Sequence, residues 1–446
     1  MTYQQAMEYL NSFQNYERVL DYRYEEVFSL DRVGRLLDRL GNPQRRYSTL
    51  HAAGTKGKGS TCAFAASILQ AAGRRVGLYT SPHLISFRER FQINGQPISE
   101  SLLAEVVARI QPLAEKELTF FEVTTACAFE AFAQAQVEVA VVEVGLGGRL
   151  DATNLVQPAV TAITQISLDH MAQLGNDLVG IAQEKAGIIK PGVPVVVAPQ
   201  SSPELTAVFE KKAETLHAPL HLLDREVQLK SAQVGTDGTR CALQTPDESY
   251  PDLKIPPLGR HQVWNAAAAV RMVELAAPIL GLDPRFRRDD LREAVARGLA
   301  QTKWPGRCQL IEGEPPVLLD GAHNAASAEV LRQTVNELFP GKRVRLIFGT
   351  AGDKDLEGMA VVLGLWAATL TITQAQHPRA ASFEKIAQVF SRWHPHPVPT
   401  RSVQEALAQS GSSAQAGDLV VVAGSLFVVA EALQELGGRM PAALAR

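Results

Sequence analysis

The sequence predicts an α/β protein, in which a doubly wound, parallel-sheet domain is followed by a smaller α/β domain. Short Val- and Ile-rich runs alternate with helical segments along the chain. Such runs are typical of parallel strands that are covered by helices on both faces. The length of 446 residues also exceeds what one hydrophobic core usually supports. We therefore expect one domain over residues 1–300 and a second over residues 304–446.

In the first domain, apolar runs are followed by glycine-rich turns and helical patterns, which predicts the strands of the larger sheet. The runs are Tyr47–Ala53, Val76–Tyr79, Val137–Val144, Val160–Ile166 and Val193–Ala198. Cys62–Ala72 has a helical pattern. Gln228–Pro256 is rich in Thr, Asp and Gly between alternating apolar residues, which predicts a hairpin-like excursion.

The second domain repeats the same alternation of strands and helices. Its expected strands are Val317–Asp320, Val344–Gly349, Leu370–Gln374 and Leu419–Ala423, and a helix is expected over Ala325–Leu338. Between the domains, Arg297–Pro305 passes from a helical stretch into a Trp-Pro turn. A turn of this kind suits a hinge.

Composition and charge narrow the function classes. Apolar residues make up 46% and charged residues 20% of the chain, a balance typical of globular proteins. The formal charge of −3 and the pI near 6.4 provide no overall basic field for nucleic acid or an anionic membrane. Apolar stretches such as Val193–Pro199 are far shorter than the roughly 20 residues of a bilayer span, and the N-terminus lacks a signal-peptide pattern. We expect a cytoplasmic protein without a nucleic-acid or membrane partner.

The cysteines predict neither a zinc site nor a disulfide scaffold. They lie dozens of residues apart, without a CxxC pair or a Cys/His cluster. Free cysteine is among the most frequently buried residue types, so we expect four buried, inert thiols. They are Cys62, Cys127, Cys241 and Cys308.

The strongest motif is the loop Gly54–Ser60, which follows a strand and opens a helix. Its glycines allow backbone N–H groups to surround phosphate oxygens, and the helix N-terminus and a lysine add positive charge. The loop departs from a standard P-loop, because Ala52 replaces the first glycine and Gly59 separates Lys58 from Ser60. By analogy, Lys58 would face the terminal phosphates of ATP and Ser60 would face Mg²⁺. A glycine-rich turn with solvated lysines is the alternative.

A carboxylate, Glu143, lies one residue before the end of the expected strand Val137–Val144 and is followed by a glycine-rich turn. Ligands of α/β sheets bind at the carboxyl edge, and a carboxylate oxygen suits Mg²⁺. The alternative is a strand-end glutamate in solvent. Arg149 and Asp151 follow the turn. They could form a structural ion pair with each other or take part in the site, and the sequence leaves both alternatives open.

Two further features carry titratable groups. Ser167–His170 ends another strand with a carboxylate and an imidazole, and His170 is either a metal ligand or a satisfied polar residue. Lys185 lies on an otherwise apolar helix. Apolar surroundings lower a lysine pKa and make the neutral amine available for carbamate chemistry.

Polar turns occur at two more strand ends. Thr80–Leu84 precedes Phe87–Arg90 and brings together hydroxyl, imidazole and guanidinium groups, although a surface turn would also fit. In the second domain, Leu318–Asn324 ends a strand with Asp, His and Asn. Arg307, just past the hinge, is either a clamp on a nucleotide when the domains close or a solvated arginine.

Together, these motifs resemble the folylpolyglutamate synthase/dihydrofolate synthase family, within the Mur-ligase-like ATP-dependent ligases. The order and spacing of the motifs over almost the whole chain make the resemblance specific. The matching segments are Arg32–Val33, Leu40–Pro43, Gly54–Thr61, Ser81–Leu84, Glu143–Asn154, Ser167–His170, Glu184–Ile188, His261–Asn265, Trp304–Gln309, Asp320–Asn324, Gly349–Met359, Pro378–Ala380 and Ala423–Phe427. The resemblance implies a P-loop-type ATPase domain and a Rossmann-like C-terminal domain.

The resemblance also implies an activity, the ATP-dependent ligation of L-glutamate to dihydropteroate, to a folyl-polyglutamate, or to both. The reaction would pass through an acyl phosphate and release ADP and phosphate. It further implies two Mg²⁺ ions, K⁺ as an additional cation, N6-carboxylation of Lys185 and a monomeric state. The residues themselves leave open a Mur-type or other amino-acid ligase, a P-loop kinase or NTPase, and a non-catalytic nucleotide switch.

Site residues are carried over from the same resemblance. The ATP site would comprise Gly54, Thr55, Lys56, Gly57, Lys58, Gly59, Ser60, Thr61, Asn265, Arg307 and Asp320. Metal ions would be held by Ser60, Ser81, Glu143 and His170, and catalysis would involve Lys58, Glu143, His170, Lys185 and His323. The incoming glutamate would meet Ser81, Arg90, His323 and Ser425. The pterin acid would lie near Phe121, Glu122, Val123, Thr124, Leu150, Asp151 and Ala152, beside Ser29, Leu30, Asp31 and Arg32. Lys56 departs from the family, which often has Asn there.

Overall fold

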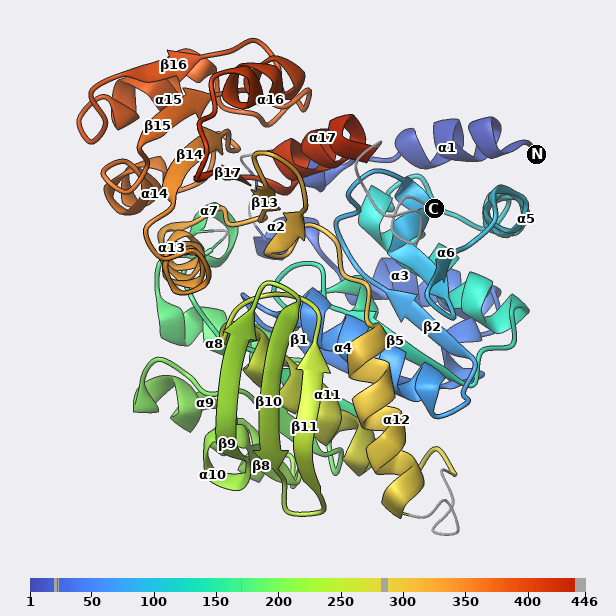
Figure 1. The fold of residues 1–446 in the computed structure, drawn as a ribbon. Coiled ribbons are helices and arrows are strands. Elements are labelled where there is room, and N and C mark those ends of the chain that lie inside the picture. The colour runs from blue at the N-terminus through green and yellow to red at the C-terminus, as the bar shows by residue number, and fades with distance from the viewer. Residues whose placement is uncertain (20–21, 23, 170, 282–287, 438–446) are drawn as a thin grey trace. The chain divides into compact units, whose positions relative to one another are not determined.

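A computed structural model describes residues 1–446 except 20–21, 23, 170, 282–287 and 438–446 (Figure 1). The chain divides into two compact units. Unit 1 comprises Met1–Ala232, Arg240–Ile255 and Gln262–Thr302, and unit 2 comprises Gln233–Thr239, Pro256–His261 and Lys303–Arg446. Each unit is built around its own sheet, so each is described separately.

The described part of unit 1 contains an eight-stranded sheet in the order β4-β3-β2-β5-β1-β6-β7-β8. Its strands are β1 (Ser48–Ala53), β2 (Val76–Tyr79), β3 (Phe91–Ile93), β4 (Gln96–Pro97), β5 (Val139–Glu143), β6 (Val160–Ile163), β7 (Val195–Val197) and β8 (Leu220–Leu222). The six strands β2, β5, β1, β6, β7 and β8 pair in parallel with their neighbours in this order. At one edge, β3 pairs antiparallel with both β2 and β4. The predicted doubly wound parallel sheet is confirmed.

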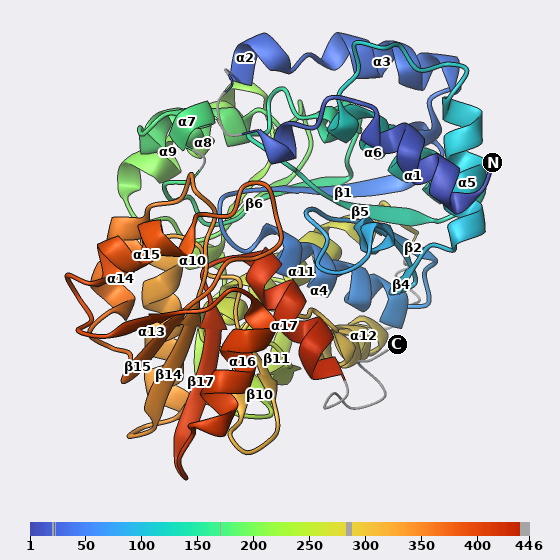
Figure 2. The ribbon, with the colours of Figure 1, turned by 90° about the horizontal axis from the view of Figure 1, so that it is seen from above.

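Helices cover both faces of this sheet. Figure 2 shows α3 (Leu30–Arg39) and α6 (Phe120–Gln134) on one side of β1 and β5, with α4 (Lys58–Ala71) and α11 (His261–Ala276) on the other. The other helices are α1 (Tyr3–Asn11), α2 (Tyr24–Val27), α5 (Glu100–Ile110), α7 (Met171–Leu174), α8 (Leu178–Ala186), α9 (Pro203–Thr215), α10 (Leu223–Glu226) and α12 (Arg288–Gln301). Short 3₁₀ turns are η1 (Tyr16–Arg18), η2 (Pro43–Arg45), η3 (Phe87–Arg90) and η4 (Ala152–Leu155).

Each predicted strand of the first domain is present, but the predicted bounds need correction at two functional positions. β6 ends at Ile163, before the predicted Ile166, so that the residues after it form a loop beside the phosphate cradle. α4 begins at Lys58 rather than at Cys62. The cause is Gly57, which caps the helix with φ of 87° and allows the chain to turn directly into it.

The excursion at residues 228–255 forms a separate three-stranded sheet, ordered β11-β10-β9 (Figure 1). Its strands are β9 (Gln228–Gly235), β10 (Gly238–Gln244) and β11 (Ser249–Ile255). Glu274 of α11 accepts hydrogen bonds from the Tyr250 hydroxyl at 2.9 Å and from the Thr245 hydroxyl at 2.8 Å. Arg271 pairs with the same carboxylate at 3.0 Å. This buried network fastens the excursion to α11, which indicates a structural role.

Within its described residues, unit 2 contains a six-stranded sheet in the order β12-β13-β17-β14-β15-β16. Its strands are β12 (Gln309–Ile311), β13 (Val317–Leu319), β14 (Arg343–Phe348), β15 (Thr369–Ile372), β16 (Pro397–Pro399) and β17 (Asp418–Ala423). Its helices are α13 (Ala325–Leu338), α14 (Leu356–Leu363), α15 (Phe383–Phe390), α16 (Val403–Ser412) and α17 (Leu426–Leu436). Figure 2 shows α13 and α16 on opposite sides of β14. The predicted helix Ala325–Leu338 and the predicted strands are confirmed.

All four cysteines are free and buried, as predicted. Burial raises the pKa of each thiol, which keeps these side chains protonated and unreactive. None of the helices in the described part of the chain combines the length and the apolar composition that a membrane span requires.

Candidate active site

The phosphate cradle lies between the end of β1 and the start of α4. At Gly54, with φ of 146°, an added Cβ would lie 1.9 Å from the Thr164 hydroxyl oxygen. At Gly57, with φ of 87°, a Cβ would lie 2.1 Å from Oδ1 of Asn265. Only glycine fits both positions, and the loop opens a 14-residue helix at its N-terminus. The geometry therefore suits a bound polyphosphate.

Asn265 lies beside the cradle, on α11, and belongs to unit 1. Of the residues predicted for the ATP site outside the loop, Asn265 therefore belongs to the unit that holds the cradle, whereas Arg307 and Asp320 belong to unit 2. Its Nδ2 donates to Oε1 of Gln262 at 3.0 Å. This contact directs the amide oxygen of Asn265 toward Gly57.

Three side chains of the cradle bind backbone or acidic groups nearby. Nζ of Lys58 donates to the Gly54 carbonyl at 3.0 Å, and the Thr55 hydroxyl donates to the Ser167 carbonyl at 3.1 Å. Lys56 forms an ion pair of 3.2 Å with Asp169, which is 9% exposed. The cradle is thus joined to the loop after β6, and Lys56 has a partner despite its departure from the family pattern.

Glu143 is the last residue of β5 and is aligned with Ala52 in β1. It is 6% exposed, so the alternative of a solvated strand-end glutamate is wrong. Its Oε2 accepts the backbone N–H of Ser81 at 3.1 Å. A buried, hard oxygen donor at the strand end next to the cradle fits Mg²⁺, and Ser60, at 5% exposure on the first turn of α4, adds a hydroxyl.

The predicted metal ligand His170 lies outside the described residues. Among the residues that are described, no group of three or more His, Cys, Asp or Glu side chains converges as a metal site. The metal set of Ser60, Ser81, Glu143 and His170 therefore stays a prediction, supported so far by the position of Glu143.

Lys185 lies near the end of α8 and is 5% exposed, as the apolar helix pattern predicted. Burial and the positive charges of Lys58 and Lys56 lower its pKa to about 7, against the opposing effect of Asp169 and Asp151. At neutral pH a large fraction of this amine is uncharged. An uncharged, buried amine is the form that reacts with CO₂ to give a carbamate.

The glycine-rich loop after Glu143 packs tightly against three neighbouring elements. A Cβ at Gly145 would lie 2.4 Å from the Phe121 ring, and one at Gly147 would lie 2.4 Å from the Tyr24 hydroxyl. At Gly148 the nearest atom would be the Glu184 carbonyl oxygen, at 2.7 Å. The loop therefore contacts α6, α2 and α8 at once.

Arg149 and Asp151, which end this loop, do not pair with each other. Arg149 binds Glu184 at 2.8 Å and Glu25 at 2.9 Å. Asp151 is 3% exposed and accepts the backbone N–H groups of Leu146 and Thr153 at 2.9 and 3.0 Å. The predicted substrate contact Asp151 thus organises the loop, while burial raises the pKa of its carboxyl group.

The predicted contacts on α6 divide into packing residues and a cap. Glu122 forms a capping box with Thr119 and is 2% exposed. Val123 and Thr124 are fully buried. Phe121 is partly buried and is pressed against Gly145. Of the four predicted contacts on α6, Phe121 is thus the one that packs against the glycine-rich loop.

The segment Ser29–Arg32 begins α3. The Ser29 hydroxyl caps the helix by accepting the Asp31 N–H at 3.3 Å. Arg32 pairs with Glu122 at 3.0 Å, so two residues predicted to contact the acceptor bind each other. Leu30 and Asp31 occupy the first turn of the same helix. The segment is therefore placed beside α6, where the sequence predicted it.

Arg90 is 1% exposed and makes a bidentate ion pair with Glu17, at 2.7 and 2.6 Å. Its Nε donates to Nδ1 of His83 at 3.0 Å. In this structure, Arg90 thus holds a carboxylate of the protein itself. The sequence offered no signal for Glu17, which lies in η1, far from Arg90 along the chain.

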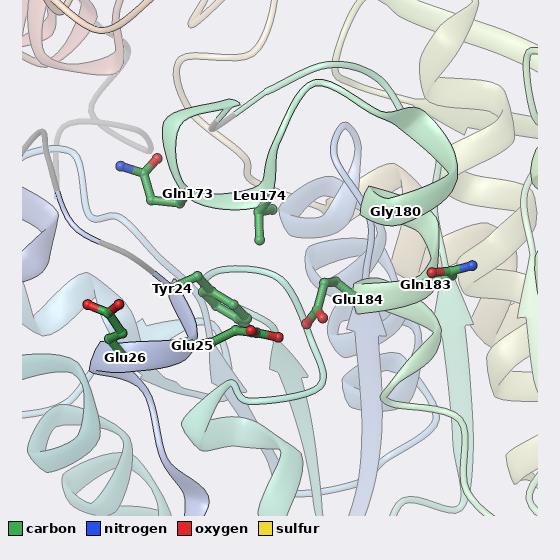
Figure 3. A pocket seen from close by; sticks show the side chains of 8 residues that line it. All are labelled: Tyr24, Glu25, Glu26, Gln173, Leu174, Gly180, Gln183 and Glu184. Atoms are coloured by element: carbon green, nitrogen blue, oxygen red, sulfur yellow. The ribbon is translucent and has the colours of Figure 1, made fainter.

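A pocket of about 480 Å³ opens beside the glycine-rich loop (Figure 3). Its walls come from α2, α7 and α8, and its lining residues are Tyr24, Glu25, Glu26, Gln173, Leu174, Gly180, Gln183 and Glu184. Figure 3 shows Glu184 pointing toward Tyr24 and Glu25. The Tyr24 hydroxyl accepts the Leu150 N–H at 3.3 Å. The sequence did not predict the pocket, because its walls come from distant segments.

In unit 2, the predicted residues lie at strand ends and helix starts. Asp320 accepts the backbone N–H groups of Cys308 and Ala322, both at 2.8 Å. Nδ1 of His323 is bonded to the Gly321 carbonyl at 2.7 Å, so Nδ1 carries the hydrogen. Ser425 caps α17. Arg307 lies against Gly321, where a Cβ would approach its Nη1 to 2.8 Å.

Comparisons with known proteins identify the family. The model described as Mur ligase middle domain matches residues 52–273, and the model described as Mur ligase, glutamate ligase domain matches residues 306–426. The dihydrofolate synthase/folylpolyglutamate synthase of Bacillus subtilis (strain 168) is 36% identical over 417 residues, which cover 91% of this chain and 94% of that protein. This chain belongs to the folylpolyglutamate synthase/dihydrofolate synthase family.

Solved structures of the family agree with the fold. Mycobacterium tuberculosis folylpolyglutamate synthase complexed with ADP has a TM-score of 0.86 and 33% identity, covering 98% of this chain and 99% of that chain. E. coli FolC in complex with DHPP and ADP has a TM-score of 0.84 and 30% identity, covering 98% of both chains. The recognised family and the α/β fold class are confirmed.

Proposed function

We propose that this chain uses ATP to join L-glutamate to dihydropteroate, to folyl-polyglutamates, or to both, releasing ADP and phosphate. As a member of its family it is an ATP-dependent acid–amino-acid ligase. The observation that carries the proposal is the convergence of the glycine cradle, Glu143 and the buried Lys185 at one edge of the unit 1 sheet.

A free carboxylate resists attack by an amine, because oxide or hydroxide would have to leave. The acceptor carboxylate therefore takes the γ-phosphoryl group of ATP and becomes an acyl phosphate. The glutamate amine then displaces phosphate, and the amide forms. The protein contributes positioning and charge neutralisation to both steps.

The cradle would hold the polyphosphate. Gly54 and Gly57 let the backbone make this turn where any side chain would collide, and the first backbone N–H groups of α4 would donate to phosphate oxygens. Lys58, at the first turn of α4, would move from the Gly54 carbonyl to a phosphate oxygen. When bound, Mg²⁺ would supply positive charge at the phosphate oxygens. Glu143 and Ser60 would hold it, with Ser81 and His170 as the further predicted ligands.

Lys185 is proposed to carry an N6-carboxyl group. Its lowered pKa and 5% exposure provide a neutral amine in a dry site, and the carbamate would change a cation into an anion beside Lys58. That change would remove the repulsion between Lys185 and Lys58 that helps to lower the pKa of Lys185. It would also add an oxygen donor close to the proposed metal region.

The acceptor acid is proposed to lie along the glycine-rich loop, between Phe121 and the pocket of Figure 3. Carboxylates of Glu25 and Glu184 would accept hydrogen bonds from amino groups of a pterin ring. Arg90 would bind the incoming glutamate after release of Glu17. His323, Ser425 and Arg307 of unit 2 enter the proposal through the family resemblance, and Asp320 enters it by accepting the backbone N–H of Cys308, next to Arg307. The proposal also includes K⁺ as a further cation, a monomeric state and a cytoplasmic location, where ATP is available.

The test supplies purified protein with ATP, Mg²⁺ and L-glutamate, and offers dihydropteroate or tetrahydrofolate in turn. Mass spectrometry should detect the addition of a glutamate to at least one acceptor. Protein that binds ADP but adds no glutamate to either acceptor would overturn the proposal. Phosphate release that depends on another carboxylate would indicate a different amino-acid ligase, and phosphate transfer without amide formation would indicate a kinase or NTPase.

A further inference from the structure

A chain of polar side chains crosses the core of unit 1 behind the glycine-rich loop. It begins at His51 in the middle of β1, which is 0% exposed. Nε2 of His51 is bonded to the Thr153 hydroxyl at 2.9 Å, and that hydroxyl donates to Oδ1 of Asp151 at 2.5 Å. Oδ2 of Asp151 accepts the Leu146 N–H at 2.9 Å. The chain therefore connects β1 to the loop.

The direction of the bonds determines the protonation of His51. The Thr153 hydroxyl uses its single hydrogen on Asp151, so it must accept from His51, and Nε2 carries the hydrogen. Nδ1 of His51 is then an acceptor, and it is buried without a hydrogen-bond partner among the described residues. Burial lowers the pKa of His51 to about 3, so the ring stays neutral at physiological pH.

Stability alone does not account for this arrangement. A buried polar atom without a partner costs about 1–3 kcal/mol, whereas an apolar side chain in the same strand would carry no such cost. Thr153 is also 0% exposed. The physical effect of the chain is to restrain the loop from its inner side, through a carboxylate that cannot move without breaking the other bonds.

The restrained loop in turn touches the groups on which the reaction depends. Its glycines press on Phe121, on Tyr24 and on the backbone of Glu184 and Lys185, with no room for a Cβ at any of these contacts. The polar chain starts from β1 at His51, and β1 continues directly into the phosphate cradle. The same strand thus fixes the position of the cradle directly and the position of the glycine-rich loop through the polar chain.

We propose that His51 and Thr153 are positioning residues, which hold the glycine-rich loop, and through it the acceptor wall and Lys185, in register with the phosphate cradle. The kinetic part of this inference rests on the proposed ligase function. The structural part, the restraint of the loop, does not.

The test compares Thr153→Val with Thr153→Ser. Valine keeps the shape of threonine but removes the hydroxyl, whereas serine keeps the hydroxyl. We expect Thr153→Val to raise KM for the acceptor acid by about tenfold, the effect of one lost hydrogen bond to a charged group. ADP affinity should change by less than twofold, because the cradle is untouched. Thr153→Ser should restore acceptor KM to within about threefold of the wild type.

Thr161→Val is the matched control. Thr161 is also fully buried in a strand, and in the described part of the chain its hydroxyl donates to the Pro194 carbonyl at 3.3 Å. The same loss of a hydroxyl there should leave acceptor KM unchanged. Three outcomes would each overturn the proposal. The two valine variants could change acceptor KM equally, Thr153→Val could weaken ADP and acceptor binding equally, or Thr153→Ser could fail to restore acceptor KM.

Hydrogen exchange tests the restraint without any reaction. The Leu146 amide should exchange at least about tenfold faster in Thr153→Val than in the wild type, and at the wild-type rate in Thr161→Val. An unchanged Leu146 rate would overturn the proposal even in an active enzyme. Wild-type protein that adds no glutamate would instead overturn the proposed function. If Thr153→Val does not fold, His51→Leu, which removes the bond between His51 and Thr153 and thereby detaches the polar chain from β1, replaces it in both measurements.

Discussion

In each unit, a carboxylate lies at the end of a buried parallel strand, but the two carboxylates have different roles. Glu143 ends β5 of unit 1, is 6% exposed and accepts a backbone N–H from Ser81 in a neighbouring loop. Asp320 follows β13 of unit 2, and its two oxygens accept the N–H groups of Cys308 and Ala322. The first stands beside a phosphate cradle, and the second organises the loops of its own unit.

The surroundings explain the difference. In unit 1, glycines with no room for a Cβ lie next to Glu143, and a buried lysine has its pKa lowered to about 7. In unit 2, the side chains at the equivalent edge cap helices or bind loop backbone, as Asn324 and Ser425 do. A carboxylate at a strand end is therefore evidence for a site only together with groups that the fold leaves available to a ligand.

The largest effect should come from Glu143→Gln. The amide removes the charge that would hold Mg²⁺ but keeps the size and the bond from Ser81, so turnover should fall by about 10²–10³-fold with an unchanged melting temperature. Steady-state kinetics and thermal unfolding measure the two quantities. Turnover within about threefold of the wild type would remove Glu143 from the metal site.

Lys185→Arg should lower turnover by about 10²-fold, because arginine stays charged and forms no carbamate. In the wild type, the neutral amine becomes the majority form as pH rises above about 7, so at equal concentrations of dissolved CO₂ the CO₂-depleted enzyme should regain activity faster at pH 8 than at pH 6. ¹³C NMR with labelled CO₂ should show one carbamate signal, lost in Lys185→Arg and kept in a control variant of the exposed Lys211. A signal that persists in Lys185→Arg would place the carbamate elsewhere.

Gly57→Ala should weaken ADP binding by about tenfold and destabilise unit 1 by about 1–2 kcal/mol. The new Cβ would collide with Asn265 at 2.1 Å, and the backbone has φ of 87°. Gly73→Ala is the control, since Gly73 has φ of 83° and no atom within 4 Å of the added Cβ. It should lose stability without losing ADP affinity, as measured by calorimetry. Equal ADP affinity in both variants would speak against the cradle.

The smallest kinetic effect should come from Asp320→Asn. One of its two backbone bonds is weakened, so the free energy of unfolding should fall by about 1–2 kcal/mol while KM for ATP stays within about threefold of the wild type. Denaturant unfolding and ATP kinetics separate the two outcomes. A rise in KM of tenfold or more at unchanged stability would instead support the nucleotide contact that the family resemblance implies, and would remove the contrast with Glu143.

Much of the fold follows from local patterns in the sequence. Apolar runs of strand length, the helix period and glycine turns are visible within a few residues, so β1, β2 and α13 were predicted close to their observed bounds. Strands such as β8 were missed because three residues, Leu220-His221-Leu222, carry too little pattern. The start of α4 was misplaced because the sequence did not reveal that Gly57 caps the helix.

By itself, the sequence determined the order of the motifs, the chemistry of the cradle and the burial of Lys185 within an apolar helix. Only the tertiary structure decided which groups are partners: Glu17 for Arg90, Glu184 for Arg149, and Thr153 for His51. These partners are far apart along the chain, and no local period connects them. Their pairing depends on which loops the sheet brings to one edge, and that is a property of the folded chain.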